Sequence, residues 1–186
     1  MELKQERGNR MSKKTAVYGM LIALAFLLSY VETLIPFSFP IPGIKLGLAN
    51  LVVLVALYSL GIRGAFAVSM VRILLSGLTF SSLSVMLYSL SGGLLSFFVM
   101  AAVRHSASFS ITGVSVLGGV AHNLGQLSVA VWVVKSPALL FYLPALLIAG
   151  TVAGALIGLL GGLVTERIRP FLRLEHGADS LGEKTD

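Results

Sequence analysis

The chain has 186 residues, of which 56% are hydrophobic and only 12% are charged. Its mean hydropathy is +0.91, which excludes a soluble domain, because roughly a quarter of the residues of such domains are charged. The net charge of +6 would suit nucleic acid, but the basic residues stand at the ends of apolar stretches, which indicates a topological signal and no nucleic-acid partner.

The apolar stretch over residues 15–165 predicts six transmembrane helices, since each needs about 20 mostly apolar residues. In chain order we expect them at residues 15–35, 45–60, 63–80, 83–103, 112–134 and 138–165. The first ends at Pro36, Pro40 and Pro42, which cannot continue a helix and predict a short external loop. The second is short, at about 16 residues against the usual 20. It is therefore expected to begin below the outer surface and to line a cavity.

These elements predict an all-α integral membrane bundle that spans the lipid bilayer. They leave no room in the chain for a second domain. We expect a cytoplasmic N-terminal segment over residues 1–14, a membrane domain over residues 15–165 and a cytoplasmic C-terminal tail over residues 166–186. The first apolar run lacks a convincing cleavage site, so it is expected to remain as a helix. The chain has no cysteine, which excludes disulfides and thiolate chemistry.

The positions of lysine and arginine predict that both termini are cytoplasmic, because loops rich in these residues stay inside. With six spans, only Lys45 and Lys135 fall outside, and Arg72 lies within a span. The other eleven fall inside: Lys4, Arg7, Arg10, Lys13, Lys14, Arg63, Arg104, Arg167, Arg169, Arg173 and Lys184. Inverting the bundle or removing one helix spoils this pattern.

Arg72 is the most informative single residue, because it lies near the middle of the third predicted span. A charged side chain there costs on the order of 2.5 to 3.5 kcal/mol on insertion scales, so it is expected to face a cavity or a partner. Its planar guanidinium suits the capture of a carboxylate or phosphate. The alternative is a buried ion pair or the capping of helix carbonyls. Arg72→Ala should abolish anion binding with the folded yield largely intact, whereas a collapse in yield would favour the alternative.

The fifth predicted span carries the densest polar group, His122, Asn123 and Gln126. His122 and Gln126 are four residues apart and share a helical face, which Asn123 flanks. Three hydrogen-bonding side chains at one depth, with Gly125 beside them, favour the lining of a binding site. The alternative is an interhelical network, in which each hydrogen bond contributes roughly 0.6 kcal/mol. One histidine does not form a metal centre, so neither a metal nor a cofactor is expected.

Three further polar residues lie on the outer side of this layer. Glu32, near the outer end of the first span, is the only acidic residue within a predicted span. With Lys45 and Asn50, at the start of the second span, it is expected to ring the mouth of an outward-facing pocket. Glu32 and Lys45 could instead snorkel at the interface or form a mutual salt bridge. Because Lys45 and Arg72 are both cationic, the pocket would attract an anionic or strongly polar small molecule.

Small residues at four-residue spacing recur on two spans. Gly150, Gly154 and Gly158 on the last span permit close helix packing, which we interpret as internal packing rather than a contact between molecules. Gly19 and Ala23 form a shorter stripe on the first span. A partner subunit is a more open possibility there, because terminal helices are often peripheral.

Four segments together resemble one family of bacterial membrane proteins. They are residues 44–50 (IKLGLAN), 71–77 (VRILLSG), 91–96 (SGGLLS) and 121–127 (AHNLGQL). They resemble the Gx transporter family, also labelled heptaprenyl diphosphate synthase component I, over roughly residues 15–165. That family is similar to the S components of energy-coupling factor (ECF) transporters, which are six-helix proteins that bind vitamins or related compounds on their outer side.

The resemblance implies an ECF S-component-like fold in the bacterial inner membrane. It also implies a transmembrane coupling protein and two ATPase subunits as partners, docked through small residues of the first helix. Gly19 and Ala23 match those positions imperfectly, because the usual pattern is alanine-rich.

We therefore expect a substrate-binding subunit, not an enzyme, for the uptake of a small anionic or amphipathic molecule such as a vitamin or an isoprenoid or quinone precursor. The partner subunits would supply the energy. No motif of the form G-x-x-x-x-G-K-[ST] occurs, so ATP would bind elsewhere. The expected pocket residues are Glu32, Lys45, Asn50, Arg72, His122, Asn123 and Gln126.

The main alternative is a non-catalytic membrane component of heptaprenyl diphosphate synthase in isoprenoid and quinone biosynthesis. Prenyl diphosphate synthases bind magnesium diphosphate through aspartate clusters, since Mg²⁺ needs hard oxygen ligands. Here both aspartates, Asp179 and Asp186, lie in the tail. A third hypothesis is a membrane enzyme with His122 as base and Arg72 as anion clamp. It is the weakest, because no acidic residue at that depth would orient the histidine.

Overall fold

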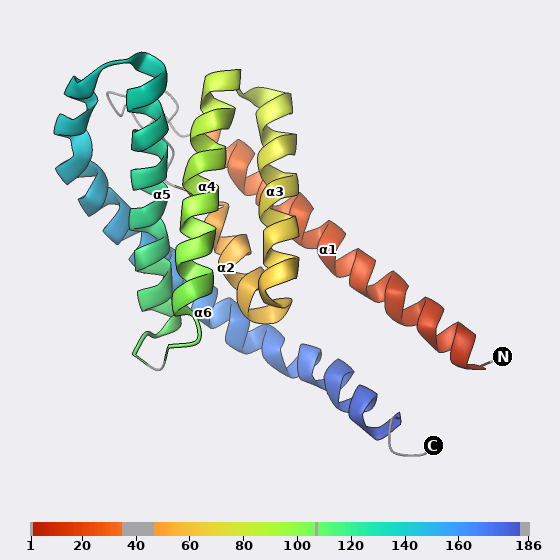
Figure 1. Cartoon of the computed structure of the whole chain (residues 1–186). Helices are drawn as coiled ribbons and strands as arrows, with labels where there is room; N and C mark the ends of the chain where they lie inside the picture. The colour runs from red at the N-terminus through yellow and green to blue at the C-terminus, as the bar shows by residue number, and fades with distance from the viewer. Residues whose placement is uncertain (1, 35–46, 107, 183–186) are drawn as a thin grey trace.

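The computed structural model describes residues 2–34, 47–106 and 108–182, and the regular structure in these ranges is entirely helical (Figure 1). The predicted proline loop falls outside them. The elements are α1 (Glu2–Leu34), α2 (Asn50–Ser59), α3 (Gly61–Phe80), α4 (Leu83–Val103), α5 (Ile111–Val134), the short 3₁₀ helix η1 (Pro137–Tyr142) and α6 (Leu143–Gly182). The predicted all-α fold is confirmed.

Five segments of the described chain are long and apolar enough to cross a membrane. They are Thr15–Leu34, Gly61–Phe80, Leu83–Val103, Ile111–Val134 and Pro137–Ile168. The remaining helix, α2, has 10 residues and is therefore about 15 Å long, half of the ~30 Å hydrocarbon core. The prediction of a short second helix is confirmed, but α2 is shorter than expected and does not span a bilayer alone.

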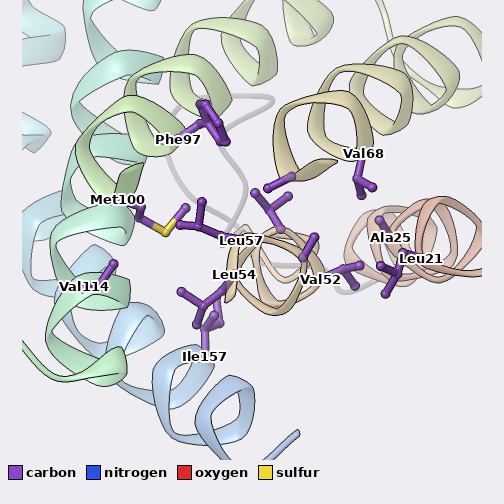
Figure 2. Close-up of a cluster of buried hydrophobic side chains, with 13 residues drawn as sticks. Leu21, Ala25, Val52, Leu54, Leu57, Val68, Phe97, Met100, Val114 and Ile157 are labelled. Carbon is purple, nitrogen blue, oxygen red and sulfur yellow. The ribbon is translucent and has the colours of Figure 1, made fainter. Parts of the chain in front are cut away.

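The short helix α2 lies in the centre of the bundle and packs against α1, α3, α4 and α6. Its sequence is apolar all round, as expected for a helix enclosed by others, and its residues 52–57 are all buried. Leu54 and Leu57 belong to a core cluster to which all six α-helices contribute, with Phe97 of α4 and Ile157 of α6 among their neighbours (Figure 2). The fold thus holds the N-terminal end of α2 inside the protein.

Glycine and proline set the junctions around this core. Gly61 adopts φ +79° between α2 and α3, a conformation that glycine tolerates without strain and that permits the tight turn there. After α5 the chain forms η1, and α6 begins at Leu143, five residues later than the predicted start at 138. Pro144 lies in the first turn of α6, where its missing N–H is harmless.

The terminal helices extend beyond the predicted spans. The first was expected at residues 15–35 and the last at 138–165, whereas α1 begins at Glu2 and α6 ends at Gly182. Hydropathy marks where a helix leaves the apolar region and says little about where the backbone stops being helical. The two extensions project from the same side of the bundle (Figure 1).

Glycines let α5 and α6 approach closely. A Cβ on Gly119 would lie 2.4 Å from the Gly150 carbonyl oxygen, and a Cβ on Gly158 would lie 2.6 Å from the Cα of Thr112. Gly154 packs in the same way against the backbone of residues 115 and 116. The interpretation of this stripe as internal packing is confirmed.

Candidate binding site

Polar side chains from four helices converge where α2 begins. Asn50 is the first residue of α2, Arg72 lies midway along α3, and His122 and Gln126 share one face of α5. Glu32 comes from the end of α1. None of these five side chains is more than 8% exposed. We refer to Glu32, Asn50, Arg72, His122 and Gln126 as the polar cluster.

One half of the polar cluster is held together by charge. The Arg72 Nη2 donates a hydrogen bond of 2.9 Å to the Asn50 Oδ1, and the Glu32 carboxylate attracts the same guanidinium. The Glu32 Oε1 also accepts hydrogen bonds from the backbone N–H groups of Gly47 and Leu48. These N–H groups come just before α2, where the helix dipole favours a negative charge. Glu32 thus anchors the turn that leads into α2 and compensates the charge of Arg72.

The opposite end of α2 is also capped by a charge. Arg104, directly after α4, donates from Nη1 to the Leu57 carbonyl at 2.5 Å. A cation is favourable near a helix C-terminus, where carbonyls lack intrahelical partners. A short apolar helix is therefore fixed at both ends, by Glu32 and by Arg104, and this keeps Asn50 at the polar cluster.

The other two residues of the polar cluster, His122 and Gln126, pack against α4 at Gly92, which has no side chain. A Cβ on Gly92 would lie 2.7 Å from the Gln126 Cγ and 3.1 Å from the His122 Cε1, and a Cβ on Gly93 would lie 3.9 Å from the Arg72 Nη2. A Cβ on Gly47, which precedes α2, would lie 3.6 Å from the His122 Cδ2, at ordinary van der Waals distance. Gly92 therefore makes room for His122 and Gln126 of α5, and Gly93 makes room for Ile73 of α3, where a Cβ would lie 2.6 Å from the Ile73 Cδ1.

Several buried polar atoms of this region have no hydrogen-bond partner. In the polar cluster they are the Arg72 Nε, the His122 Nδ1 and both amide atoms of Gln126. The Oγ atoms of Ser69 and Ser96 are in the same condition. More than 90% of buried polar groups in folded proteins are paired, so such a group of unpaired atoms is typical of a site that binds a ligand or ordered water.

Asn123 is the predicted site residue that points elsewhere. Its Nδ2 donates a hydrogen bond of 2.7 Å to the Leu146 carbonyl of α6, and it lies against Gly150. This is the interhelical bond that the sequence left as an alternative. One residue of offset turns a side chain by about 100° around the helix axis, so Asn123 faces α6 while His122 faces α4.

The two residues predicted to dock a partner, Gly19 and Ala23, lie away from the polar cluster. Lys45 falls outside the described residues. Gly19 and Ala23 lie on an exposed face of α1, and a Cβ on Gly19 would meet nothing within 4 Å. Their proposed role in docking a partner therefore stays a prediction.

A small cavity adjoins Asn50 on the side of α4, α5 and α6. Its volume is about 10 Å³, and Ser96 and Ser115 contribute hydroxyl groups to its walls. Such a volume holds one water molecule, so a vitamin or a prenyl compound would bind beside Asn50 only if the surrounding helices move apart. No group of three or more His, Cys, Asp or Glu residues that could hold a metal ion occurs in the part of the chain that the structure describes.

Sequence reasoning did not nominate Gly47, Gly92, Gly93 or Ser96 as residues of the site. The available signal was the glycine pair in the middle of an apolar span, since adjacent glycines weaken a helix and usually indicate a close approach. Without knowledge of which helices flank α4, that signal does not identify the side chains that approach.

A helical membrane bundle with a buried polar cluster at the start of a short central helix defines a polytopic membrane protein with a candidate ligand site. A family model for heptaprenyl diphosphate synthase component I matches residues 21–164, and the chain belongs to that family. No curated protein and no solved structure matches the chain. The matched range includes every residue of the polar cluster.

Proposed function

We propose that the protein is a membrane-embedded substrate-binding subunit for the uptake of a small amphipathic molecule. The observation that carries the proposal is the polar cluster, in which buried atoms of Arg72, His122 and Gln126 lack hydrogen-bond partners. Unsatisfied polar groups are costly in a membrane interior, and ionisable residues there usually serve a solute site. The short helix α2 supports this further, because its first residue lies buried in the bundle and transporters often place substrate sites where a helix ends inside the membrane.

The proposed orientation places both termini in the cytoplasm and the chain in the bacterial inner membrane. Arg63 at the start of α3 and Arg104 after α4 lie at the end of the bundle from which the terminal helices project. This clustering of basic residues supports a cytoplasmic position for that end. The polar cluster would then open to the outer side.

Energy would come from partner subunits, namely a transmembrane coupling protein and ATPases. The exposed face of α1 around Gly19 and Ala23 is the proposed docking surface, since it offers small residues with open space above them. The protein itself would carry out no chemical reaction.

Three measurements test this function. Purified protein in lipid nanodiscs should show a ligand-dependent rise in its melting temperature with pools of vitamins, flavins, quinone precursors or prenyl compounds, and it should co-purify with ATPases. A deletion strain should take up the active compound more slowly. If no pool shifts the melting temperature and deletion leaves uptake unchanged, the proposal fails.

The name of the family favours a second candidate function, a non-catalytic component of a prenyl diphosphate synthase. In this case the protein would position a soluble synthase at the membrane, where the prenyl product partitions. It should then co-purify with the synthase, and its removal should change the product length. Co-purification with ATPases and an unchanged product would argue for the uptake function instead.

A further inference from the structure

We infer that the polar cluster recognises an uncharged, planar group that carries a hydrogen-bond donor beside an acceptor, such as a carboxamide, lactam or imide. This inference rests on the proposed function, because it names the class of compound that the same site would bind. It replaces the anionic ligand that the basic residues alone suggest.

The charge balance of the polar cluster disfavours an anion. Among the described residues it contains one cation, Arg72, whose Nη2 is already bonded to Asn50, and one anion, Glu32, which attracts Arg72. Within the described residues, a carboxylate or phosphate would therefore find no cation that Glu32 does not already attract, and burying a charge without a partner is costly. A neutral ligand leaves the balance intact.

The unpaired atoms show which neutral chemistry fits. Gln126 is completely buried and both its Nε2 and its Oε1 lack partners. A primary amide presents donors and an acceptor side by side, so its natural complement is another amide edge, bound through two parallel hydrogen bonds. The unpaired His122 Nδ1 adds a third polar contact, because both side chains pack against Gly92.

Asn123 shows that α5 does satisfy a buried amide where its role is structural. Three positions before Gln126, its Nδ2 is bonded to the Leu146 carbonyl. Two buried amides on one helix thus differ, since Asn123 is bonded within the protein and Gln126 is not. This difference indicates that the unpaired Nε2 and Oε1 of Gln126 bind a ligand.

The test uses the full chain in lipid nanodiscs with three pairs of ring compounds: nicotinamide with nicotinate, benzamide with benzoate, and uracil with orotate. We expect the neutral member of at least one pair to raise the melting temperature with an apparent affinity at least tenfold above that of its anion. Gln126→Met, which keeps length and volume, should lower that affinity at least tenfold without lowering the melting temperature of the free protein. Asn123→Leu serves as the control, and it should lower the melting temperature while keeping the preference.

In the binding test, three results would overturn the inference: equal or tighter binding of the anions, an unchanged preference in Gln126→Met, or no binding of any pair. A separate experiment tests the proposed function itself. The protein is incubated with a small-molecule extract of the expressing cells and washed, and the retained compounds are identified by mass spectrometry. A retained anion without an amide-like edge overturns the inference and leaves the function standing. If no compound is retained, both fail.

Discussion

Arg72 belongs both to the proposed site and to the scaffold, because its guanidinium is bonded to Asn50 and attracted by Glu32. From the sequence, Arg72→Ala was expected to leave the folded yield largely intact if the residue serves a ligand. The contacts change that expectation. Removing a buried charge that another charge stabilises is costly, since the remaining charge is less well compensated.

We therefore predict that Arg72→Leu lowers the melting temperature strongly, whereas the double variant Glu32→Gln and Arg72→Leu loses less stability than the sum of the two single variants. The coupling arises because the second substitution removes the charge that the first leaves unpaired. Thermal unfolding of the four proteins in nanodiscs measures it. Additive losses would contradict the compensation of Arg72 by Glu32.

A second prediction for a single residue concerns Asn123. Asn123→Leu should destabilise the protein by about 1 to 3 kcal/mol, because the buried Leu146 carbonyl loses its donor. Ligand binding should be unchanged once the lower stability is taken into account. A loss of binding without a loss of stability would instead assign Asn123 to the site.

Pattern and spacing predict part of this residue-level arrangement. The four-residue interval between His122 and Gln126 correctly predicts a shared face. It does not distinguish the face towards α4 from the face towards α6, and for this reason Asn123 was grouped with them. The pairing of Arg72 with Asn50 joins residues 22 positions apart, and no local pattern encodes it.

At the scale of elements, the hydropathy of the chain predicts the number of helices, and in the described residues five of them are long enough to span a membrane. It predicts their ends less well. The start of α6 depends on the packing of η1, and the extensions of α1 and α6 are helical outside the apolar region. The end of α2 is better marked, because Gly61, the first residue of α3, has φ +79° and permits the turn between the two helices.

The close packing of α5 on α6 leads to a matched pair of glycine substitutions. Gly119→Ala places a Cβ 2.4 Å from the Gly150 carbonyl oxygen, so the two helices must separate, and we expect a loss of about 1 to 3 kcal/mol. Gly162→Ala meets nothing within 4 Å and should be neutral or stabilise by up to about 1 kcal/mol, through the higher helix propensity of alanine. Equal melting temperatures of the two variants would contradict this packing.

For the whole molecule, the side of the membrane to which the proposed site opens depends on which end of the bundle faces the cytoplasm. The chain contains no cysteine, so single cysteines report topology without background. We predict that Ala138→Cys reacts with a membrane-impermeant maleimide in intact cells. Ser108→Cys should react only after permeabilisation, because positively charged loops stay inside. Both positions are exposed in the structure, and the reverse labelling pattern would invert the proposed site.

A structure of the protein with a bound compound tests most directly whether the polar cluster binds a small molecule. The protein would be loaded with the compound that raises its melting temperature most and imaged in nanodiscs at a resolution that shows side chains. We predict density for that compound within hydrogen-bond distance of Gln126 and His122. Density elsewhere in the bundle, with both side chains bonded only to the protein, would contradict this prediction.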